Sequence, residues 1–372
     1  MSNWELYRLL CRIIGGLGDT ALGAVIRRDA FPRLVALAGE YDLEPALAVR
    51  LNEQAALISS IPAQLNEQLQ QALQANTQQK LQIIAQTIKV ARVLNSAGIE
   101  PVFLKGTALL LGESPLAVGF RKQVDIDLLV APENIAAACE ALTADGYFFY
   151  DFDRTEPEPF ADTPTALELS AHHHHLPPLG KQGYGTLLEL HKQPVRRRFQ
   201  TQLSVARLLD TAILTQSHGA KFLLPAPAFQ LMHLALGTFL NDSYAARFDF
   251  PLRAGQDYLE IISRGTPVSI TQLPALSGSR FGHAMQLFEQ LVVELMAPHC
   301  STRLYPACDI RNRLRIMEQR FNSRSIGRLL DLQARWRYLG LSLWYDSGKL
   351  PAYLNRMLQD RKPGKTTVIG EP

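Results

Sequence analysis

The sequence is poor in cysteine and carries little net charge. Its 372 residues include four cysteines, Cys11, Cys139, Cys300 and Cys308, and no two of them form a C-x-x-C pair. This is not the pattern of a disulfide framework or a zinc knuckle, and it favours a reducing compartment. The formal net charge of +3 is too small to predict nucleic-acid binding from the composition as a whole.

We also find no pattern of an export signal or of a membrane-spanning helix in the sequence. The first residues carry Glu5, Arg8 and Arg12 within an apolar pattern, whereas a signal peptide has its charges first and then an uninterrupted apolar run. Residues 222–241 contain no Asp, Glu, Lys or Arg, but a helix that begins after Pro227 is too short for roughly 30 Å of bilayer. We therefore expect a cytoplasmic protein in which this stretch is a buried core helix.

The remaining composition predicts a globular chain with two helical regions. Hydrophobic residues make up 47% of the sequence and charged residues 20%, enough for a real core. Apolar residues recur at helical spacing through the first hundred residues and again from about residue 200. We predict an N-terminal helical region over 1–93, a mixed core over 94–200, a C-terminal helical region over 201–360 and a flexible tail over 361–372.

Between the helical regions the pattern changes to alternating strands and helices. An apolar strand is predicted over 102–104, followed at once by a helix over 107–112, and residues 124–130 alternate with the period of a second strand. A helix is predicted over 132–146. Two more strand candidates, 167–179 and 186–194, flank a glycine-rich stretch that suits an antiparallel hairpin. The predicted fold class is α+β: a small mixed sheet with helices packed on it, flanked by helical regions.

Two acids on the second predicted strand are candidate metal ligands. Asp125 and Asp127 lie two residues apart, so both carboxylates project to one face while Ile126 and Leu128 turn into the core. Neighbouring carboxylates repel each other unless a cation lies between them. Mg²⁺ is the natural cation, because it prefers oxygen ligands and is shared between carboxylates and phosphates. Alone, D-x-D is a weak signal that fits a solvated strand end equally well.

A group of positive and small residues before this strand is suited to binding a phosphate. Lys105, Gly106 and Thr107 lie where a strand turns into a helix, where glycine permits close backbone approach and the helix start offers free N–H groups. Lys105 adds a positive charge. Arg121, four residues before Asp125, is predicted either to contact phosphate or to pair with a carboxylate. The alternative for Lys105 to Thr107 is an ordinary strand-to-helix turn.

A third acid and a nearby histidine lie on a later strand. Glu189 sits between two leucines, and an adjacent strand would bring it beside the aspartate pair. There it would bind a second metal ion or take the proton from an attacking hydroxyl; the alternative is a plain surface acid. His191 shares the face of Glu189 and is interpreted as orienting that acid, contacting substrate or filling a structural position.

Three further polar groups are given simpler interpretations. The run His172–His175 lacks a cysteine or tight histidine spacing that would complete a zinc site, so we expect it to line the substrate site or an exposed strand. A hydrolase that uses this run to bind a transition metal is an alternative function. Arg196–Arg198 are interpreted as a solvated turn. Arg253 and Asp257, four apart on a predicted helix, are expected to form a surface ion pair.

Three motifs, in this order, resemble a known family. PVFLKGTALLL, GFRKQVDIDLLV and LLELH resemble the uncharacterised nucleotidyltransferase family of the polymerase-β-like nucleotidyltransferase superfamily, most strongly over about 94–191 and more weakly to about 258. In this resemblance Gly106–Thr107 match the family's turn. Asp125 and Asp127 match its metal-binding pair, and Glu189 matches its third acid. Lys105 and Arg121 match two cations that are typical of the family. Thr107 replaces the usual Ser but keeps its hydroxyl, and the stretch from Thr107 to Asp125 is longer than usual.

The resemblance implies a reaction and a set of ligands. A nucleoside monophosphate would pass from a nucleoside triphosphate such as ATP to an acceptor hydroxyl or phosphate, and pyrophosphate would leave. Asp125, Asp127 and Glu189 would hold two Mg²⁺ ions, while Lys105 and the Gly106–Thr107 turn would bind the β- and γ-phosphates. The acceptor stays open among a small molecule, a protein and a nucleic-acid end. A non-catalytic member that binds nucleotide, or protein partners through the helical regions, is the alternative.

Overall fold

The computed structural model describes residues 1–16, 30–54, 58, 61–112, 117–151, 158–264, 280–297 and 307–345. The chain divides into two compact units, each assembled from separate segments of the sequence. The first, here called the helical unit, comprises Met1–Gln82, Leu109–Gln123 and Arg247–Asp331. The second, the sheet unit, comprises Ile83–Ala108, Val124–Ala246 and Leu332–Pro372. The predicted tail, 361–372, lies outside the described residues.

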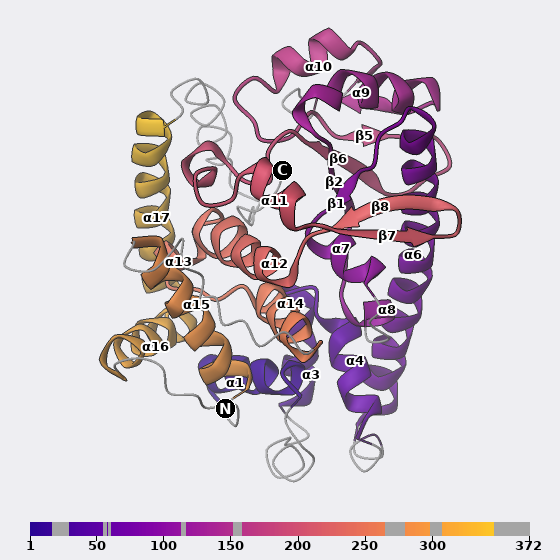
Figure 1. The fold of residues 1–372 in the computed structure, drawn as a ribbon. Coiled ribbons are helices and arrows are strands. Elements are labelled where there is room, and N and C mark those ends of the chain that lie inside the picture. The colour runs from indigo at the N-terminus through magenta and orange to yellow at the C-terminus, as the bar shows by residue number, and fades with distance from the viewer. Residues whose placement is uncertain are drawn as a thin grey trace. The chain divides into compact units, whose positions relative to one another are not determined.

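A mixed sheet of eight strands lies at the centre of the sheet unit (Figure 1). Its order is β4-β3-β5-β6-β2-β1-β8-β7, and the pairs β6–β2 and β1–β8 are parallel while the other neighbours are antiparallel. The strands are β1 (Val102–Phe103), β2 (Asp125–Leu129), β3 (Phe148–Tyr150), β4 (Pro159–Phe160), β5 (Leu179–Gly180), β6 (Leu187–His191), β7 (Ile213–Ser217) and β8 (Ala220–Leu224). The predicted α+β class is confirmed.

Helices make up most of the rest of the described chain. Those before β2 are α1 (Asn3–Ile14), α3 (Phe31–Glu40), α4 (Glu44–Asn52), α6 (Ala63–Ser96), α7 (Lys105–Leu111) and α8 (Ala117–Phe120). Those between β2 and the end of the sheet are η1 (Pro132–Asn134), α9 (Ile135–Ala144), α10 (Thr163–Leu169), η2 (Arg197–Phe199) and α11 (Val205–Thr211). The later ones are α12 (Pro227–His233), η3 (Leu234–Leu240), α13 (Tyr244–Arg247), α14 (Leu252–Ser263), α15 (Arg280–Met296), α16 (Ala307–Asn322) and α17 (Arg324–Tyr345).

The centre of the sheet follows from strict alternation along β2 and β6. The side chains of Ile126, Leu128, Leu188 and Leu190 have no exposed surface and form one buried face. Because successive side chains of a strand point to opposite faces, the acidic residues between them all project to the other face. The apolar face therefore fixes the direction in which the acids point.

One predicted strand is wrong over its first half. Residues 167–169 of the strand predicted over 167–179 belong instead to helix α10 (Thr163–Leu169). Asp162 caps this helix by accepting the Thr165 N–H at 2.8 Å, and Pro164 occupies its first turn. The antiparallel pairing of the predicted hairpin is confirmed at its other end. Leu179 of β5 pairs with Leu188, and an isolated bridge joins His175 to His191.

The predicted return to helices at about residue 200 is interrupted by a hairpin. Helix α11 ends at Thr211, and β7 and β8 then pair antiparallel around a turn in which His218 and Gly219 have φ angles of 48° and 77°. Positive φ at both central residues suits a tight hairpin turn. The sheet therefore extends past residue 200.

The apolar stretch 222–241 ends in a buried helical segment, as expected. Helix α12 begins at Pro227, and its continuation η3 is a π-helix in which Leu234, Leu236 and Phe239 are buried. Within the described ranges, none of the helices has both the length and the apolar character needed to span a membrane.

The helical unit has an aromatic core near its N-terminal helix. Helix α1 begins with a capping box in which the Ser2 hydroxyl and the Glu5 carboxylate each accept the other residue's backbone N–H. Tyr7 is fully buried, packs against Phe321 with ring centroids 4.1 Å apart, and donates its hydroxyl to the Phe250 carbonyl at 3.1 Å. These contacts join segments that are far apart in the sequence.

Candidate metal centre

Two neighbouring parallel strands bring two acids side by side. Strands β2 and β6 pair in a register that sets Asp127 opposite Glu189, so their side chains project to the same face of the sheet. His191 follows Glu189 by two residues and shares that face. Glu189 therefore lies on the strand next to the aspartates, as expected.

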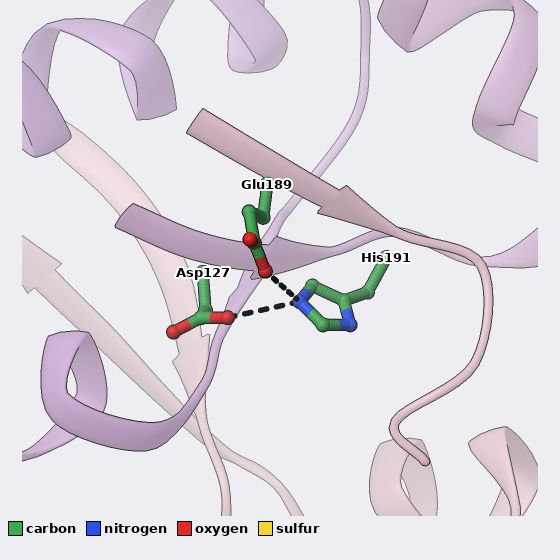
Figure 2. Close-up of side chains that lie close together, drawn as sticks. All are labelled: Asp127, Glu189 and His191. Carbon is green, nitrogen blue, oxygen red and sulfur yellow. Dashed lines mark hydrogen bonds and ion pairs between the residues drawn. The ribbon is translucent and has the colours of Figure 1, made fainter. Parts of the chain in front are cut away.

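The three side chains converge on one point (Figure 2). His191 Nε2 lies 2.9 Å from Asp127 Oδ1 and 3.4 Å from Glu189 Oε2. The side chains of Asp127 and His191 are 3% and 0% exposed, while that of Glu189 is 18% exposed. One ligand atom from each residue lies within 4.8 Å of the other two. The group is thus buried on the strand side and reachable at Glu189.

Lys105 supplies a positive charge to the same two carboxylates. Its ammonium group donates to Asp127 Oδ1 and lies 3.8 Å from Glu189 Oε2, and its side chain is 36% exposed. Lys105 also has a φ of 48°, a left-handed conformation that costs free energy for a residue with a side chain. The turn between β1 and α7 holds this conformation because the Leu104 N–H donates to the Asp127 carbonyl at 3.0 Å.

These contacts keep both acids ionised. Burial raises the pKa of Asp127, but the Lys105 charge and the His191 hydrogen bond outweigh it and hold the pKa well below its usual range. Burial likewise raises the pKa of Glu189, and the His191 hydrogen bond and the Lys105 charge bring it below its ordinary value. Burial lowers the pKa of Lys105, but the charges of Asp127, Glu189 and Asp125 raise it well above the ordinary value.

The histidine responds to the same two acids. Burial and the Lys105 charge lower the pKa of His191, but its hydrogen bonds with Asp127 and Glu189 outweigh them and raise the pKa above its ordinary value. Since a carboxylate only accepts hydrogen bonds, His191 donates its Nε2–H to Asp127. The cluster thus brings the Lys105 ammonium and the His191 ring into contact with both carboxylates.

Asp125 lies at the next position along the same face. It stands opposite Leu187 in the β2–β6 register and is half-buried at the start of the strand. The ligand-spaced group contains Asp127, Glu189 and His191 rather than Asp125. The structure therefore brings Asp127 and Glu189 into contact with Lys105 and leaves Asp125 one strand position away.

The small residues of the turn are buried. Thr107 has no exposed surface, and its hydroxyl accepts the backbone N–H of Asp127 at 3.2 Å. Gly106 lies in the first turn of α7 and is buried, and the positive φ falls at Lys105 rather than at this glycine. Thr107 thereby holds the backbone that carries Asp127.

Arg121 belongs to the helical unit, where it pairs with an acid. Its Nε donates to Asp257 Oδ1 at 2.7 Å, and the two side chains are 20% and 5% exposed. Of the two roles predicted for Arg121, the one seen in the structure is an ion pair with a carboxylate. The predicted Arg253–Asp257 pair is wrong, because Asp257 faces Arg121 and the Arg253 guanidinium lies 3.9 Å from Asp42.

Part of the histidine run packs against the site. The ring centroids of His174 and His175 lie 5.3 and 5.4 Å from that of His191. The backbone fixes this segment, since the His174 carbonyl accepts the N–H groups of Lys192 and Gln193. Burial lowers the pKa of His175 to about 4 and that of His174 well below its ordinary value. Among the described residues, the run contributes no member to a ligand-spaced group.

A further buried histidine was not predicted as a site residue. His233, at the end of α12, is 6% exposed, and burial together with the charges of Lys105 and His191 lowers its pKa to about 3. Gly237, one turn later in the π-helix, leaves room for its ring, because a Cβ there would lie 2.9 Å from the ring. The signal in the sequence is a single histidine inside an otherwise uncharged apolar run.

The donor set fits a divalent cation. Two carboxylate oxygens and one imidazole nitrogen converge from rigid neighbouring strands, and oxygen and nitrogen donors of this kind bind divalent ions. The ionised state of both acids at neutral pH is the state that such an ion requires. These residues are thus able to hold a metal ion.

The fold and the site together define a mixed α+β protein with a carboxylate–histidine centre on parallel strands. The family described as an uncharacterised nucleotidyltransferase matches residues 29–267, more than half of the chain. The protein belongs to this family, which confirms the resemblance carried by the three motifs. The matched range includes the whole sheet and the residues of the centre. A search of curated proteins finds no match to the chain.

Proposed function

We propose that the protein transfers a nucleoside monophosphate from a nucleoside triphosphate, such as ATP, to an acceptor hydroxyl or phosphate. The observation that carries this proposal is the in-register pair Asp127 and Glu189, ionised and adjacent, in a chain of a nucleotidyltransferase family. Fold alone supports many chemistries, so the site rather than the sheet is the main support. The acceptor is a small molecule, a protein or a nucleic-acid end.

Three acids are proposed to hold the metal. Asp127 and Glu189 offer adjacent oxygens, and Asp125 adds a third carboxylate on the same face of β2. Mg²⁺ is the proposed ion for a position that it shares with the triphosphate. When bound, such an ion supplies charge neutralisation for the attacking and leaving oxygens.

Lys105 is proposed to bind the β- and γ-phosphates. Its ammonium stays charged, its side chain is part-exposed, and four carbons of stem let it turn from the carboxylates toward a ligand. Gly106 and Thr107 support that role by fixing the turn, with the Thr107 hydroxyl anchoring Asp127. Arg121 is proposed as a phosphate contact only in a state in which it has left Asp257.

The proposed reaction balances within the site. The acceptor oxygen forms a bond to the α-phosphorus, the bond from the α-phosphorus to the bridging oxygen breaks, and pyrophosphate leaves with the bonding electrons. The acceptor proton passes to Glu189, which is the more exposed of the two central acids, and from there to water.

The test is to incubate the full chain with Mg²⁺, cell extract and each of the four ribonucleoside triphosphates, labelled at the α- or the γ-phosphate. The proposal predicts that an acceptor fraction gains α label and no γ label. Asp125→Asn with Asp127→Asn should abolish this transfer. Asp145→Asn, which alters an ion pair with Lys181 elsewhere in the sheet unit, should retain it. Equal transfer by the double variant would contradict the proposal.

A second candidate is a nucleotide-binding member of the family without turnover. The observation that favours it is the Lys105 ammonium, which already neutralises the two central acids. In that case the labelled triphosphates would bind to the purified chain, no fraction would gain label, and protein partners would bind through the helical regions. The cytoplasmic location and the four-part division of the chain remain predictions.

A further inference from the structure

His191 is placed as a ligand would be. An ion with six ligands and bonds of about 2.1 Å sets adjacent donor atoms about 3 Å apart. His191 Nε2 lies 2.9 Å from Asp127 Oδ1 and 3.4 Å from Glu189 Oε2, so these two distances are close to the spacing of adjacent ligands on one ion (Figure 2). One ligand atom from each of the three residues lies within 4.8 Å of the other two. Because all three residues lie on β2 and β6, the sheet holds that spacing.

The other nitrogen of the same ring has an unmet hydrogen-bonding requirement. Among the residues that the structure describes, buried His191 Nδ1 has no hydrogen-bond partner, and the same is true of His174 Nδ1 on the neighbouring ring. Buried polar atoms without partners are costly and uncommon. No hydrogen bond joins these two nitrogens, although the two ring centroids lie 5.3 Å apart.

For a metal ion to bind at Nε2, the hydrogen that this nitrogen donates to Asp127 must leave, and the remaining ring hydrogen lies on Nδ1. With the hydrogen on Nδ1, the lone pair of Nε2 is free and points between the two carboxylates. Histidines that bind metals use this arrangement, in which the second ring nitrogen donates to a partner and fixes the ring. The His174 segment is itself held to β6 by the N–H groups of Lys192 and Gln193.

A nitrogen donor changes which ion the position favours. Mg²⁺ prefers a full set of oxygen ligands and gives up its waters reluctantly. Imidazole nitrogen favours first-row transition-metal dications, whose affinity for mixed nitrogen and oxygen sites rises from Mn²⁺ to Co²⁺ and beyond. Asp125 lies outside the ligand-spaced group, and its carboxylate offers oxygen atoms alone.

We propose that Asp127, Glu189 and His191 form a three-residue site that binds a first-row transition-metal dication in preference to Mg²⁺. The site is one of the two metal positions of the proposed nucleotidyltransferase, so this inference rests on the proposed function. His191 Nε2 is the third ligand.

The first test needs no variant. The purified, metal-stripped full chain is titrated with Mn²⁺ alone, free Mn²⁺ is read by electron paramagnetic resonance, and Mg²⁺ is added as a competitor. The proposal predicts one Mn²⁺ bound with an affinity roughly tenfold or more above that for Mg²⁺. Pulsed measurements on the bound Mn²⁺ should show coupling to a ¹⁴N nucleus. Bound Mn²⁺ without nitrogen coupling would overturn the proposal.

The second test uses matched histidine variants. His191→Asn should lower Mn²⁺ affinity by roughly tenfold or more while leaving Mg²⁺ affinity nearly unchanged, because Mg²⁺ does not depend on the nitrogen. His218→Asn is the control, since His218 is exposed at the β7–β8 turn, and it should change neither affinity. Equal loss of both ions in His191→Asn would overturn the assignment of His191 as a selective ligand.

Different results would contradict the histidine site and the proposed transferase. If Mg²⁺ binds as well as Mn²⁺ and no nitrogen couples, the histidine site is wrong and the proposed transferase keeps its metal. If the wild-type chain binds neither ion, with or without ATP, the metal centre of the proposed function is wrong as well.

Discussion

The two units treat their buried charges differently. In the helical unit the Arg121 guanidinium faces the Asp257 carboxylate at 2.7 Å, a pairing of one cation with one acid. In the sheet unit Lys105 and His191 both contact Asp127 and Glu189, so two acids share one small volume. A one-to-one pair stabilises a packing arrangement, whereas two converging acids repel each other unless a cation stays with them.

The cations of the two units, Arg121 and Lys105, also differ in how firmly they are held. Arg121 has a planar, permanently charged group suited to a fixed contact, and its side chain is 20% exposed. Lys105 has a flexible stem, is 36% exposed and begins from a left-handed backbone conformation. We infer that the first cation is part of the structure and that the second is able to leave when a metal ion takes its place.

The largest expected effect comes from removing one of the converging charges. Asp127→Asn keeps the shape but removes a ligand, and metal ions contribute several kcal/mol to transition-state stabilisation. Nucleotidyl transfer should therefore fall roughly 10³-fold, measured as α label in the acceptor fraction. Asp145→Asn in the same unit is the control, and a matching fall in that variant would show that the loss reflects general disruption.

The corresponding change in the helical unit should affect stability instead. Asp257→Ala leaves the Arg121 guanidinium without this carboxylate, which costs about 3 kcal/mol for a largely buried pair. Urea unfolding should show this loss, while Mn²⁺ affinity should stay as in the wild type. Glu318→Ala, at an exposed position of α16, should change neither property. A selective loss of Mn²⁺ binding in Asp257→Ala would contradict the division of roles.

The buried histidine beside the site should make the chain sensitive to acid. The unfolded imidazole binds its proton near pH 6.5, but burial holds the pKa of His233 to about 3 in the folded chain. As pH falls below 6.5, His233 becomes protonated in the unfolded state but stays neutral in the folded state, so the free energy of unfolding decreases. By pH 5 this group accounts for about 2 kcal/mol.

Comparing His233→Gln with the wild type isolates that contribution. Urea unfolding at pH 7 and pH 5 should show a smaller loss of stability in the variant, by about 2 kcal/mol at pH 5. His218→Gln, at an exposed turn, should lose as much as the wild type. Equal pH dependence in all three proteins would mean that His233 takes up its proton in the folded state.

The smallest expected effect concerns the resident cation. Lys105→Met keeps the stem and removes the charge that competes with a metal ion. Mn²⁺ should then bind about tenfold more tightly, which stabilises the variant by about 1.4 kcal/mol more than the wild type at the same free Mn²⁺ concentration. Thermal unfolding with and without Mn²⁺ measures this difference.

A lysine from an ordinary ion pair is the control for that experiment. Lys181→Met removes the partner of Asp145 in the same unit and should respond to Mn²⁺ as the wild type does. If Mn²⁺ stabilised Lys105→Met no more than the other two proteins, Lys105 would not occupy the place of the metal ion.

Much of the central sheet was predictable because its signals are local. The alternation of Asp125, Ile126, Asp127 and Leu128 predicts β2, and the two leucines around Glu189 predict β6 with its acid on one face. Those patterns are complete within five to seven residues of sequence. Once β2 and β6 are adjacent, this alternation places their acids on the same face of the sheet.

The remainder depends on contacts between distant residues. The β2–β6 register joins residues 64 positions apart in the His191–Asp127 hydrogen bond, and the Arg121–Asp257 pair spans 136 positions. No local pattern encodes either partner. The helix that Asp162 caps takes up residues 167–169 of the strand predicted over 167–179. The helical periodicity before Thr211 gave no sign of the hairpin that follows it.

The most direct test of the account is the position of the ion itself. Crystals of the full chain soaked in Mn²⁺ would reveal it by anomalous scattering. One anomalous peak is expected within bonding distance of Asp127 Oδ1 and Glu189 Oε2, with the Lys105 ammonium displaced from both oxygens. No peak at these oxygens, with Lys105 still in contact with Asp127, would contradict it.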